Sequence, residues 1–349
     1  MTPELLQKLE DIIAINKQTD DSAVVFQLKQ LLYDNEIHSE KEVISITELV
    51  TENLRQLREE TFQNDIIKTG FQDLDNIIGG FLPGEFVVIG GRPAIGKTTF
   101  LVDLSLNISK TVPLLYITLE LSDKQLTNRF IASLSEIPMY PTKQQTVTSA
   151  EWERIDSIDR EFASHQLFIL DNRNNDISIL KTHCEKQIHK NGVKVIVIDY
   201  LQLASSYQNR KYRELEVSSV CRELKNIAKE HNVCIIVSSQ LNRSVENRCG
   251  IEGKRPQLSD LRESGAIEQN ADKVILLNRP EYYGIREDCE GNSLIGIADI
   301  IVAKNRNGVT GEVRLHFDCK IPKFSDFEGF KDDFIFSSDR LKEIEETPF

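Results

Sequence analysis

Residues 91–100 read GRPAIGKTTF, and they follow directly on FLPGEFVVIG at residues 81–90. The segment 81–90 is typical of a strand, and the segment after it fits the pattern G-x-x-x-x-G-K-[ST] that joins such a strand to a helix. Glycines in this turn let backbone N–H groups converge on a phosphate, and the following helix N-terminus favours negative charge. We expect Lys97 to reach the β- and γ-phosphates of a nucleoside triphosphate and Thr98 to bind Mg²⁺. The other residues expected in this nucleotide-binding loop are Gly91, Arg92, Pro93, Ala94, Ile95, Gly96 and Thr99.

Short apolar runs alternate with amphipathic helical patterns along most of the chain after Gln63. Runs that are apolar at successive positions, rather than at every second one, are typical of strands buried on both faces of a parallel sheet. The sequence therefore predicts an α/β domain with a mostly parallel sheet, and such sheets bind ligands beyond the carboxyl ends of their strands. The predicted strands are EFVVIGG, PLLYITLE, HQLFILD, VKVIVIDY, NVCIIVSSQ, ADKVILLN, IGIADIIVAK and GEVRLHF.

The composition excludes several classes of protein. Of the 349 residues, 40% are hydrophobic and 28% are charged, which is ordinary for a globular protein. No segment approaches the roughly 18 apolar residues of a membrane span, and the first twenty residues lack the layout of a signal peptide, so we expect a cytoplasmic protein. The six cysteines are dispersed without a C-x-x-C pair and are interpreted as reduced thiols. The net charge of −13 argues against bulk coating of nucleic acid, but not against local basic loops.

Three polar side chains end predicted strands, which is where catalytic groups lie in such a sheet. Asp199 ends VKVIVID, and an acid in this position is typical of the residue that approaches the metal of a P-loop ATPase. Glu120 ends LLYITLE, in a position to orient the attacking water, and Gln240 ends CIIVSSQ, in a position to sense the γ-phosphate. Polar residues also end strands for structural reasons, so each one alone indicates little. Together with the phosphate loop they predict a hydrolysis site.

A long segment between Gln240 and Ala271 is rich in basic residues and poor in apolar ones. Loops of this length in compact domains are usually functional. Arginines can hold a nucleic acid backbone without stacking aromatics, and the segment contains no aromatic residue. Acidic residues such as Glu246, Glu252 and Asp260 nearly balance the charge, so a solvated surface loop stays an alternative. The basic residues are Arg243, Arg248, Lys254, Arg255 and Arg262.

Helical patterns, with apolar residues at three- and four-residue spacing, occupy the start of the chain. TPELLQKLEDIIAI and SAVVFQLKQLLYDN predict a helical hairpin, and ISITELVTENLRQLREE predicts a third helix. Nothing nearby is predicted to cover the apolar stripe of the third helix, so we expect it to pack outside its own segment. The stripe consists of Ile46, Leu49, Val50, Leu54 and Leu57.

The motifs follow one another in an order that resembles one family. GRPAIGKTTF, YITLELS, VIVIDYLQL, VSSQLNR, PQLSDLRESGAIEQNAD and AKNRNG are similar to the motor domain of DnaB-type replicative helicases, which are hexameric RecA-like ATPases. The resemblance covers roughly residues 62–320, and SDLRESGAIEQNAD is its most specific part. It implies an ATP- and Mg²⁺-dependent DNA helicase that forms a ring of six subunits and moves 5′ to 3′ on single-stranded DNA in replication.

The resemblance also implies roles for individual residues. Lys97 and Thr98 would bind the nucleotide and Mg²⁺. Glu120 would be the catalytic carboxylate, Asp199 the Walker B acid beside the metal, and Gln240 the γ-phosphate sensor. The remaining implied sets are Lys304 and Arg306, which would reach the γ-phosphate on the neighbouring subunit, and Arg262, Glu263 and Gly265, which would contact the DNA backbone together with Arg243 of the basic segment.

The resemblance divides the chain into four parts. They are a short helical N-terminal segment at 1–42, a linker helix at 43–61 that would dock on the adjacent subunit, a RecA-like ATPase motor domain at 62–324, and an acidic C-terminal tail at 325–349. In the family a large helical domain forms a collar before the linker helix, whereas about forty residues stand there in this chain. A collar and the recruitment of a loader or primase therefore stay open. Val309 stands where the family has a proline, which is a small change. Ala94 and Ile95 stand where the family usually has Ser-Met, and we expect no loss of activity because these side chains need not touch phosphate.

Two other classes of function stay open on the sequence. A nucleotide-switched ATPase that binds or loads on DNA without unwinding it would have the same site, and the short N-terminal segment favours it somewhat. A recombinase-type RecA filament is disfavoured by RESGAIEQ and the linker helix, and an inactive scaffold by the presence of every hydrolytic residue. Unwinding of a forked duplex separates the motor from the switch.

Overall fold

The computed structural model describes residues 44–58, 66–138, 148–172, 175–204, 213–248, 250–261 and 264–327. The chain divides into two compact units, Met1–Phe62 and Gln63–Phe349. The predicted N-terminal hairpin and most of the predicted acidic tail lie outside the described residues. None of the helices in the described ranges is long and apolar enough to cross a membrane.

Helix α3 (Ile46–Arg58) belongs to the first unit and confirms the third helix that the sequence predicts. Ser45 and Glu48 cap its start, because each backbone N–H donates to the other residue's side-chain oxygen at 3.2 Å. The predicted apolar stripe is exposed, with 44–73% of each described side chain open to solvent. Its described members are Ile46, Leu49, Val50 and Leu54.

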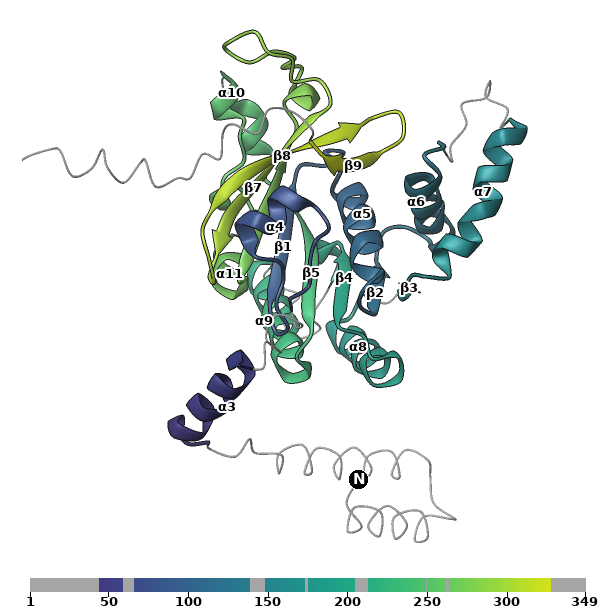
Figure 1. Ribbon diagram of the computed structural model, residues 1–349. Helices are drawn as coiled ribbons and strands as arrows, with labels where there is room; N and C mark the ends of the chain where they lie inside the picture. The colour runs from purple at the N-terminus through teal and green to yellow at the C-terminus, as the bar shows by residue number, and fades with distance from the viewer. Residues whose placement is uncertain are drawn as a thin grey trace, which may run out of the picture. The chain divides into compact units, whose positions relative to one another are not determined.

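One nine-stranded sheet organises the described residues of the second unit, in the order β3-β2-β4-β5-β1-β6-β7-β8-β9 (Figure 1). The pairs from β3 through β6 are parallel, and the pairs from β6 through β9 are antiparallel. The mostly parallel sheet and its eight predicted strands are thus confirmed. The strands are β1 (Phe86–Gly91), β2 (Leu114–Thr118), β3 (Leu167–Asp171), β4 (Val195–Asp199), β5 (Cys234–Gln240), β6 (Lys273–Asn278), β7 (Ile297–Asn305), β8 (Gly311–Asp318) and β9 (Lys323–Asp326).

Helices cover both faces of the sheet, because successive side chains of a strand point to opposite sides. Val87 and Ile89 of β1 pack in a core with α4, α5 and α6, whereas Phe86 and Val88 pack in a second core with α8, α9 and α11. Burial on both sides explains why strands in the middle of the sheet, such as β1, lack a polar alternation. β8 does alternate, with Val313, Leu315 and Phe317 buried and the residues between them exposed. The helices are α4 (Gln72–Ile78), α5 (Lys97–Ser109), α6 (Asp123–Ser135), α7 (Ser149–Phe162), α8 (Ile177–Asn191), α9 (Arg213–His231), α10 (Gly250–Gly253) and α11 (Ser264–Asn270), with 3₁₀ turns η2 (Leu201–Leu203), η4 (Arg243–Asn247), η5 (Leu258–Asp260) and η6 (Pro280–Tyr283).

The strand directions sort the predicted functional residues onto two edges of the sheet. The carboxyl ends of β1 and β5 lie side by side, since Gly91 pairs with Gln240, and Asp199 at the end of β4 pairs with β2. β7 runs the other way, so its last residue, Asn305, pairs with Lys273 at the start of β6. Residues that follow β7 therefore lie at the edge opposite the phosphate loop.

Strand β9 is absent from the prediction, and it runs past residue 324, where the sequence places the end of the ATPase domain, to Asp326. Its Phe324 packs edge-on against Phe100 of α5, with ring centroids 5.4 Å apart. Four residues are too few to show a period in the sequence. The contact nevertheless braces α5, the helix that begins at the phosphate loop.

Candidate functional site

The phosphate loop connects β1 to α5 at the carboxyl edge of the sheet. Gly96 has a φ of +112°, and a Cβ atom there would lie 3.2 Å from the ring of Phe324. A Cβ atom on Gly91 would lie 2.7 Å from the side chain of Ile95. Both positions are therefore restricted to glycine, which explains the spacing of the motif in physical terms.

The side chain of Lys97 folds back onto the backbone of this loop. Its Nζ donates to the carbonyl oxygens of Gly91 and Arg92, both at 2.9 Å. Burial lowers the pKa of Lys97 to about 8, although the charges of Asp199 and Glu120 raise it. A phosphate beside the amine would favour its charged form further, because a nearby opposite charge raises the pKa of a lysine.

Asp199 is the centre of a buried group of hydroxyls at the end of β4. Thr98 Oγ1 donates to its Oδ2 at 2.7 Å, and Ser238 Oγ of β5 donates to its Oδ1 at 2.5 Å. The hydroxyl of Tyr116 on β2 donates to Oδ2 at 3.3 Å. These contacts hold the carboxylate of Asp199 in one orientation, facing the start of α5.

The pair of Thr98 and Asp199 fits Mg²⁺ by its chemistry. Mg²⁺ prefers oxygen ligands, and in phosphate-transfer sites it usually takes one or two from the protein and the rest from phosphates and water. A hydroxyl and a carboxylate oxygen 2.7 Å apart offer such a pair. Elsewhere in the described ranges, no group of three or more His, Cys, Asp or Glu could hold a metal.

Glu120 and Gln240 come from the strands on either side of β4. β2 ends at Thr118, so Glu120 stands in the bend after the strand, where it is exposed and close enough for its charge to act on Lys97. Gln240 is the last residue of β5, and its N–H donates to Gln202 Oε1 at 3.2 Å. The structure therefore brings both predicted residues to the phosphate loop.

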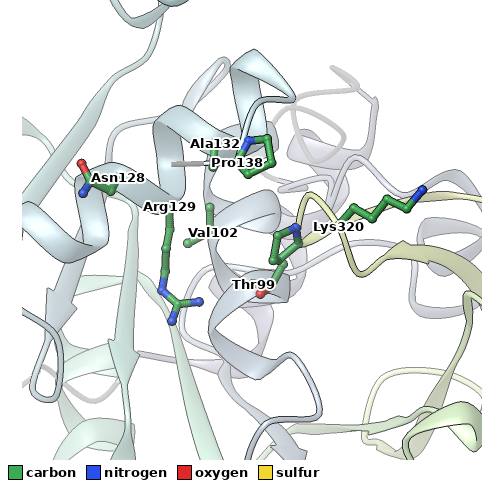
Figure 2. Close-up of a pocket in the computed structure, with 8 residues that line it drawn as sticks. Thr99, Val102, Asn128, Arg129, Ala132, Pro138 and Lys320 are labelled. Carbon is green, nitrogen blue, oxygen red and sulfur yellow. The ribbon is translucent and has the colours of Figure 1, made fainter. Parts of the chain in front are cut away.

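A pocket lies next to the phosphate loop, between α5, α6 and the turn after β8 (Figure 2). Thr99 and Val102 line it from α5, Arg129 lines it from α6, and Lys320 borders it from the turn, with its amine pointing away from these three residues in Figure 2. Nε of Arg129 is buried without a hydrogen-bond partner in the described part of the chain. Because Thr99 follows Thr98 directly, the pocket adjoins the phosphate site.

Arg92 ties the phosphate loop to the segment after β5. Its side chain is 5% exposed, and its Nε and Nη2 donate to Glu246 Oε1 at 2.8 and 2.6 Å. Its Nη1 donates to the carbonyl oxygen of Leu241 at 2.7 Å. The sequence assigns Arg92 to nucleotide binding. In the structure its guanidinium donates to protein partners, so only its backbone remains in place to contact a phosphate.

The segment after β5 keeps most of its described basic side chains in contacts within the protein, although only the pair of Arg248 and Asp260 joins two residues of the segment itself. Of the basic residues described between positions 241 and 261, only Arg243 is exposed. Arg262 and Glu263 lie outside the described residues, and Gly265 is exposed in α11. The internal contacts join Arg248 to Asp260, Arg255 to Glu312 and Asp299, and Lys254 to the ring of Tyr283.

Arg306 and Lys304 lie at the edge of the sheet opposite the phosphate loop, where Figure 1 shows α11. Arg306 lies in an exposed turn, as its neighbours Asn305, Asn307 and Gly308 predict. Its side chain is 44% exposed, and its Nη1 lies 3.0 Å from Asp272, which is 10% exposed, so the turn also holds an ion pair that the sequence does not predict. Lys304 donates to the carbonyl oxygen of Glu268, and burial lowers its pKa. The length of β1, about 20 Å at 3.3 Å per residue, separates Arg306 from the phosphate loop of its own subunit.

These features are those of a P-loop ATPase site, and residues 66–326 match the family model of the DnaB-like helicase C terminal domain. The chain belongs to the DnaB-like helicases. It is 35% identical over 318 residues to a probable replicative DNA helicase of Trieres chinensis, and the match covers 89% of this chain and 69% of that protein. It is 35% identical to the replicative DNA helicase DnaB of Rickettsia conorii, over 85% of this chain and 65% of that one. This DnaB-like chain thus spans about two thirds of the length of these relatives.

Solved structures share the fold of this DnaB-like chain. A DnaB-like replicative helicase, whose interactions with primase were also studied, superposes with a TM-score of 0.75 at 28% identity, over 93% of this chain and 75% of that one. A separately solved ATPase domain superposes with a TM-score of 0.73 at 29% identity, over 82% of this chain and 100% of that one. The predicted RecA-like fold and the resemblance to DnaB-type helicases are therefore confirmed.

Sequence reasoning missed four residues of this DnaB-like site. Ser238 and Tyr116 hold Asp199, Gln202 contacts the backbone of Gln240, and Glu246 holds Arg92. Ser238 and Gln202 left a weak signal, since Ser238 is a polar residue inside β5 two positions before Gln240, and Gln202 is a polar residue three positions after Asp199. Tyr116 left none, because a tyrosine inside a buried strand is an ordinary core residue.

Proposed function

We propose that this DnaB-like chain is an ATP hydrolase that works as a DNA helicase or translocase, assembles into a hexameric ring, and moves 5′ to 3′ on single-stranded DNA in replication. The observation that carries the proposal is the division of the hydrolytic residues between two edges of one sheet. Lys97, Thr98 and Asp199 stand at one edge and Arg306 at the other. A complete site then needs two subunits, which is how a ring of ATPases is built.

The residues at the carboxyl edge support hydrolysis of ATP. Thr98 and Asp199 would hold Mg²⁺, which, when bound, neutralises the charge that develops on the phosphate oxygens. The amine of Lys97 is positioned to move from backbone carbonyls to the β- and γ-phosphates. Glu120 follows β2 in an exposed bend, where it can orient the attacking water, and Gln240 ends the neighbouring strand as the γ-phosphate sensor. The pocket beside Thr99 would take the part of the nucleotide beyond the phosphates.

The opposite edge supports catalysis between subunits. Arg306 is half exposed, and Asp272 holds it at the surface rather than in a core. An arginine that reaches the γ-phosphate of a neighbour stabilises the charge of the transition state, with Lys304 beside it. The exposed stripe of α3 supports the role of a linker helix that docks on the adjacent subunit.

Contact with single-stranded DNA would come from the segment after β5. Exposed Arg243 and Gly265 lie in described parts of this segment, and Arg262 and Glu263 complete the proposed set. Such contacts go to the sugar-phosphate backbone, so binding would be independent of sequence and sensitive to salt. The direction of movement, the role in replication, a cytoplasmic location and any loader or primase partner are proposed from the similarity to replicative helicases.

Unwinding of forked DNA tests the proposed function. A fork with a free 5′ tail and a fork with only a 3′ tail are incubated with ATP, and ATP turnover is followed in parallel. We expect unwinding of the 5′-tailed fork alone, and none by Lys97→Ala. ATP-dependent binding and turnover without unwinding of either fork would instead indicate a nucleotide-switched loading ATPase. ATP binding and turnover that do not depend on DNA at all would refute both the helicase and the loading ATPase.

A further inference from the structure

Arg92 contacts two functional regions of the second unit at once. Its guanidinium makes hydrogen bonds with Glu246 at 2.6 and 2.8 Å and with the carbonyl oxygen of Leu241 at 2.7 Å. Its own carbonyl oxygen accepts a hydrogen bond from Lys97 Nζ at 2.9 Å. A single nearly buried residue thus joins the phosphate-binding lysine to the segment that follows β5.

Glu246 and Arg243 lie on one face of the same short helix, η4. Side chains three residues apart eclipse in a 3₁₀ helix, because it has three residues per turn. Val245 is fully buried and fixes the helix from its other side, while Asn242 Oδ1 accepts from the N–H of Ser244 and closes the start of the turn. A force on Arg243 therefore acts on Glu246 through one compact turn rather than through a flexible loop.

We propose that Glu246, acting through Arg92, is the positioning residue that couples DNA bound at η4 to the phosphate loop. The proposal rests on the proposed function, in which Arg243 contacts DNA. A DNA phosphate at Arg243 would shift η4, and the two hydrogen bonds that Arg92 donates to Glu246 would move the guanidinium with it. Because Lys97 is bonded to the carbonyl of the same residue, the shift changes how readily Lys97 leaves the loop for the nucleotide.

The contact has the features that transmission requires. Two nitrogens of the Arg92 guanidinium donate to the same carboxylate oxygen, Oε1 of Glu246, and hydrogen bonds between charged groups are about twice as strong as those between neutral groups. Arg92 is 5% exposed, so water competes little for its donors, whereas the side chain of Glu246 is 38% exposed and has room to move. Gln240, the proposed γ-phosphate sensor, directly precedes Leu241, so the same guanidinium also touches the end of the sensor strand.

Steady-state ATP turnover at increasing concentrations of single-stranded oligonucleotide tests the coupling. Glu246→Ala removes the carboxylate, and Asn247→Ala is the matched control because it alters the same exposed helix without touching Arg92. We expect Glu246→Ala to lower the maximal stimulation, which is the ratio of turnover at saturating DNA to turnover without DNA, at least about fivefold, the lower end of the usual range for coupling between two sites. The half-maximal DNA concentration should change less than about twofold. Asn247→Ala should match the wild type in the stimulation, in the half-maximal concentration and in turnover without DNA.

A merely structural role for Glu246 would give a different result. If the residue only shaped the DNA site, the half-maximal concentration would rise while the maximal stimulation stayed, and the proposal would be overturned. Glu246→Gln keeps an oxygen that accepts from Arg92, so it should retain more stimulation than Glu246→Ala, and equal loss in both would also overturn the proposal. Thermal unfolding and native mass verify that each variant folds and assembles. A wild-type protein that binds no single-stranded DNA would refute the proposed function itself.

Discussion

We expect Asp103 to make the free energy of unfolding of this protein depend on pH. The residue lies on α5, six residues after Lys97 of the phosphate loop, and it is buried between this helix, α6 and β9. Its Oδ1 accepts from Ser133 Oγ at 2.5 Å, and its Oδ2 accepts from the N–H of Phe324 at 2.7 Å. Burial raises the pKa of Asp103 from 3.8 to about 7 despite these bonds. We expect Asp103→Asn to remove the resulting pH dependence.

The sign follows from proton binding in the two states. Between pH 3.8 and about 7 the folded protein holds the proton of Asp103 and the unfolded chain does not. The folded state therefore binds more protons, and the free energy of unfolding falls as pH rises, until it levels off above the folded pKa. At about 1.4 kcal/mol per pKa unit, the loss between pH 5 and pH 8 is about 2–3 kcal/mol. An asparagine does not titrate, and it can still accept from Phe324 and donate to Ser133.

Urea unfolding of both proteins at several pH values between 5 and 8 measures this loss, because the difference between them cancels the other titrating groups. The difference should grow in favour of Asp103→Asn as pH rises. Asp156→Asn, on the exposed face of α7, is the matched control and should run parallel to the wild type. Parallel curves for Asp103→Asn and the wild type would show that Asp103 titrates alike in both states and would refute the reasoning.

The other predictions concern the ATPase site and the DNA contact. Glu120→Gln should bind ATP and leave it uncleaved in a filter-binding and turnover assay, because the carboxylate orients water and not nucleotide; normal turnover would remove Glu120 from that role. Arg306→Ala and Lys97→Ala subunits, each inactive alone, should regain some ATP turnover when mixed, since a wild-type Arg306 then faces an intact phosphate loop; mixed rings, verified by native mass, that stay inactive would disprove action between subunits. Arg243→Ala should weaken binding to all single-stranded sequences alike, by about 1–3 kcal/mol, and reduce the salt dependence in fluorescence titrations, whereas Arg255→Ala, whose guanidinium is paired internally, should leave the salt dependence unchanged.

Local features of the chain were predictable because their causes are local. Gly91 is required by its contact with Ile95, and Gly96 by its positive φ, so both glycines of the phosphate loop have a cause within the loop, to which the contact of Gly96 with Phe324 adds. Their spacing before Lys97 therefore identifies the loop in the sequence. Strands buried on both faces, such as β1 and β4, must be apolar at successive positions, which makes them visible in the sequence. β8 is visible for another reason, because apolar and polar residues alternate along it. β9 was missed because a short edge strand with polar residues carries no such pattern.

Residues that act through distant partners were predictable only in part. The position of Gln240 and Asp199 at strand ends follows from the parallel sheet, so the sequence could place them together. Their supporting hydroxyls could not be chosen among many serines and tyrosines. The ion pairs of Arg248 and Arg255 likewise depend on which acidic residues the folded chain brings near. As a result, of the arginines that the structure describes in this basic segment, only Arg243 is exposed.

The sequence by itself determined the phosphate loop, the class of the sheet and, through the order of its motifs, the family. These depend on contacts between neighbours in the chain and on periods of burial. Only the tertiary structure decided that β7 is antiparallel to β6, which carries Arg306 to the edge opposite the phosphate loop. It alone also joined Arg92 to Glu246 and Arg306 to Asp272, because strand pairing and loop packing bring together residues that no local pattern relates.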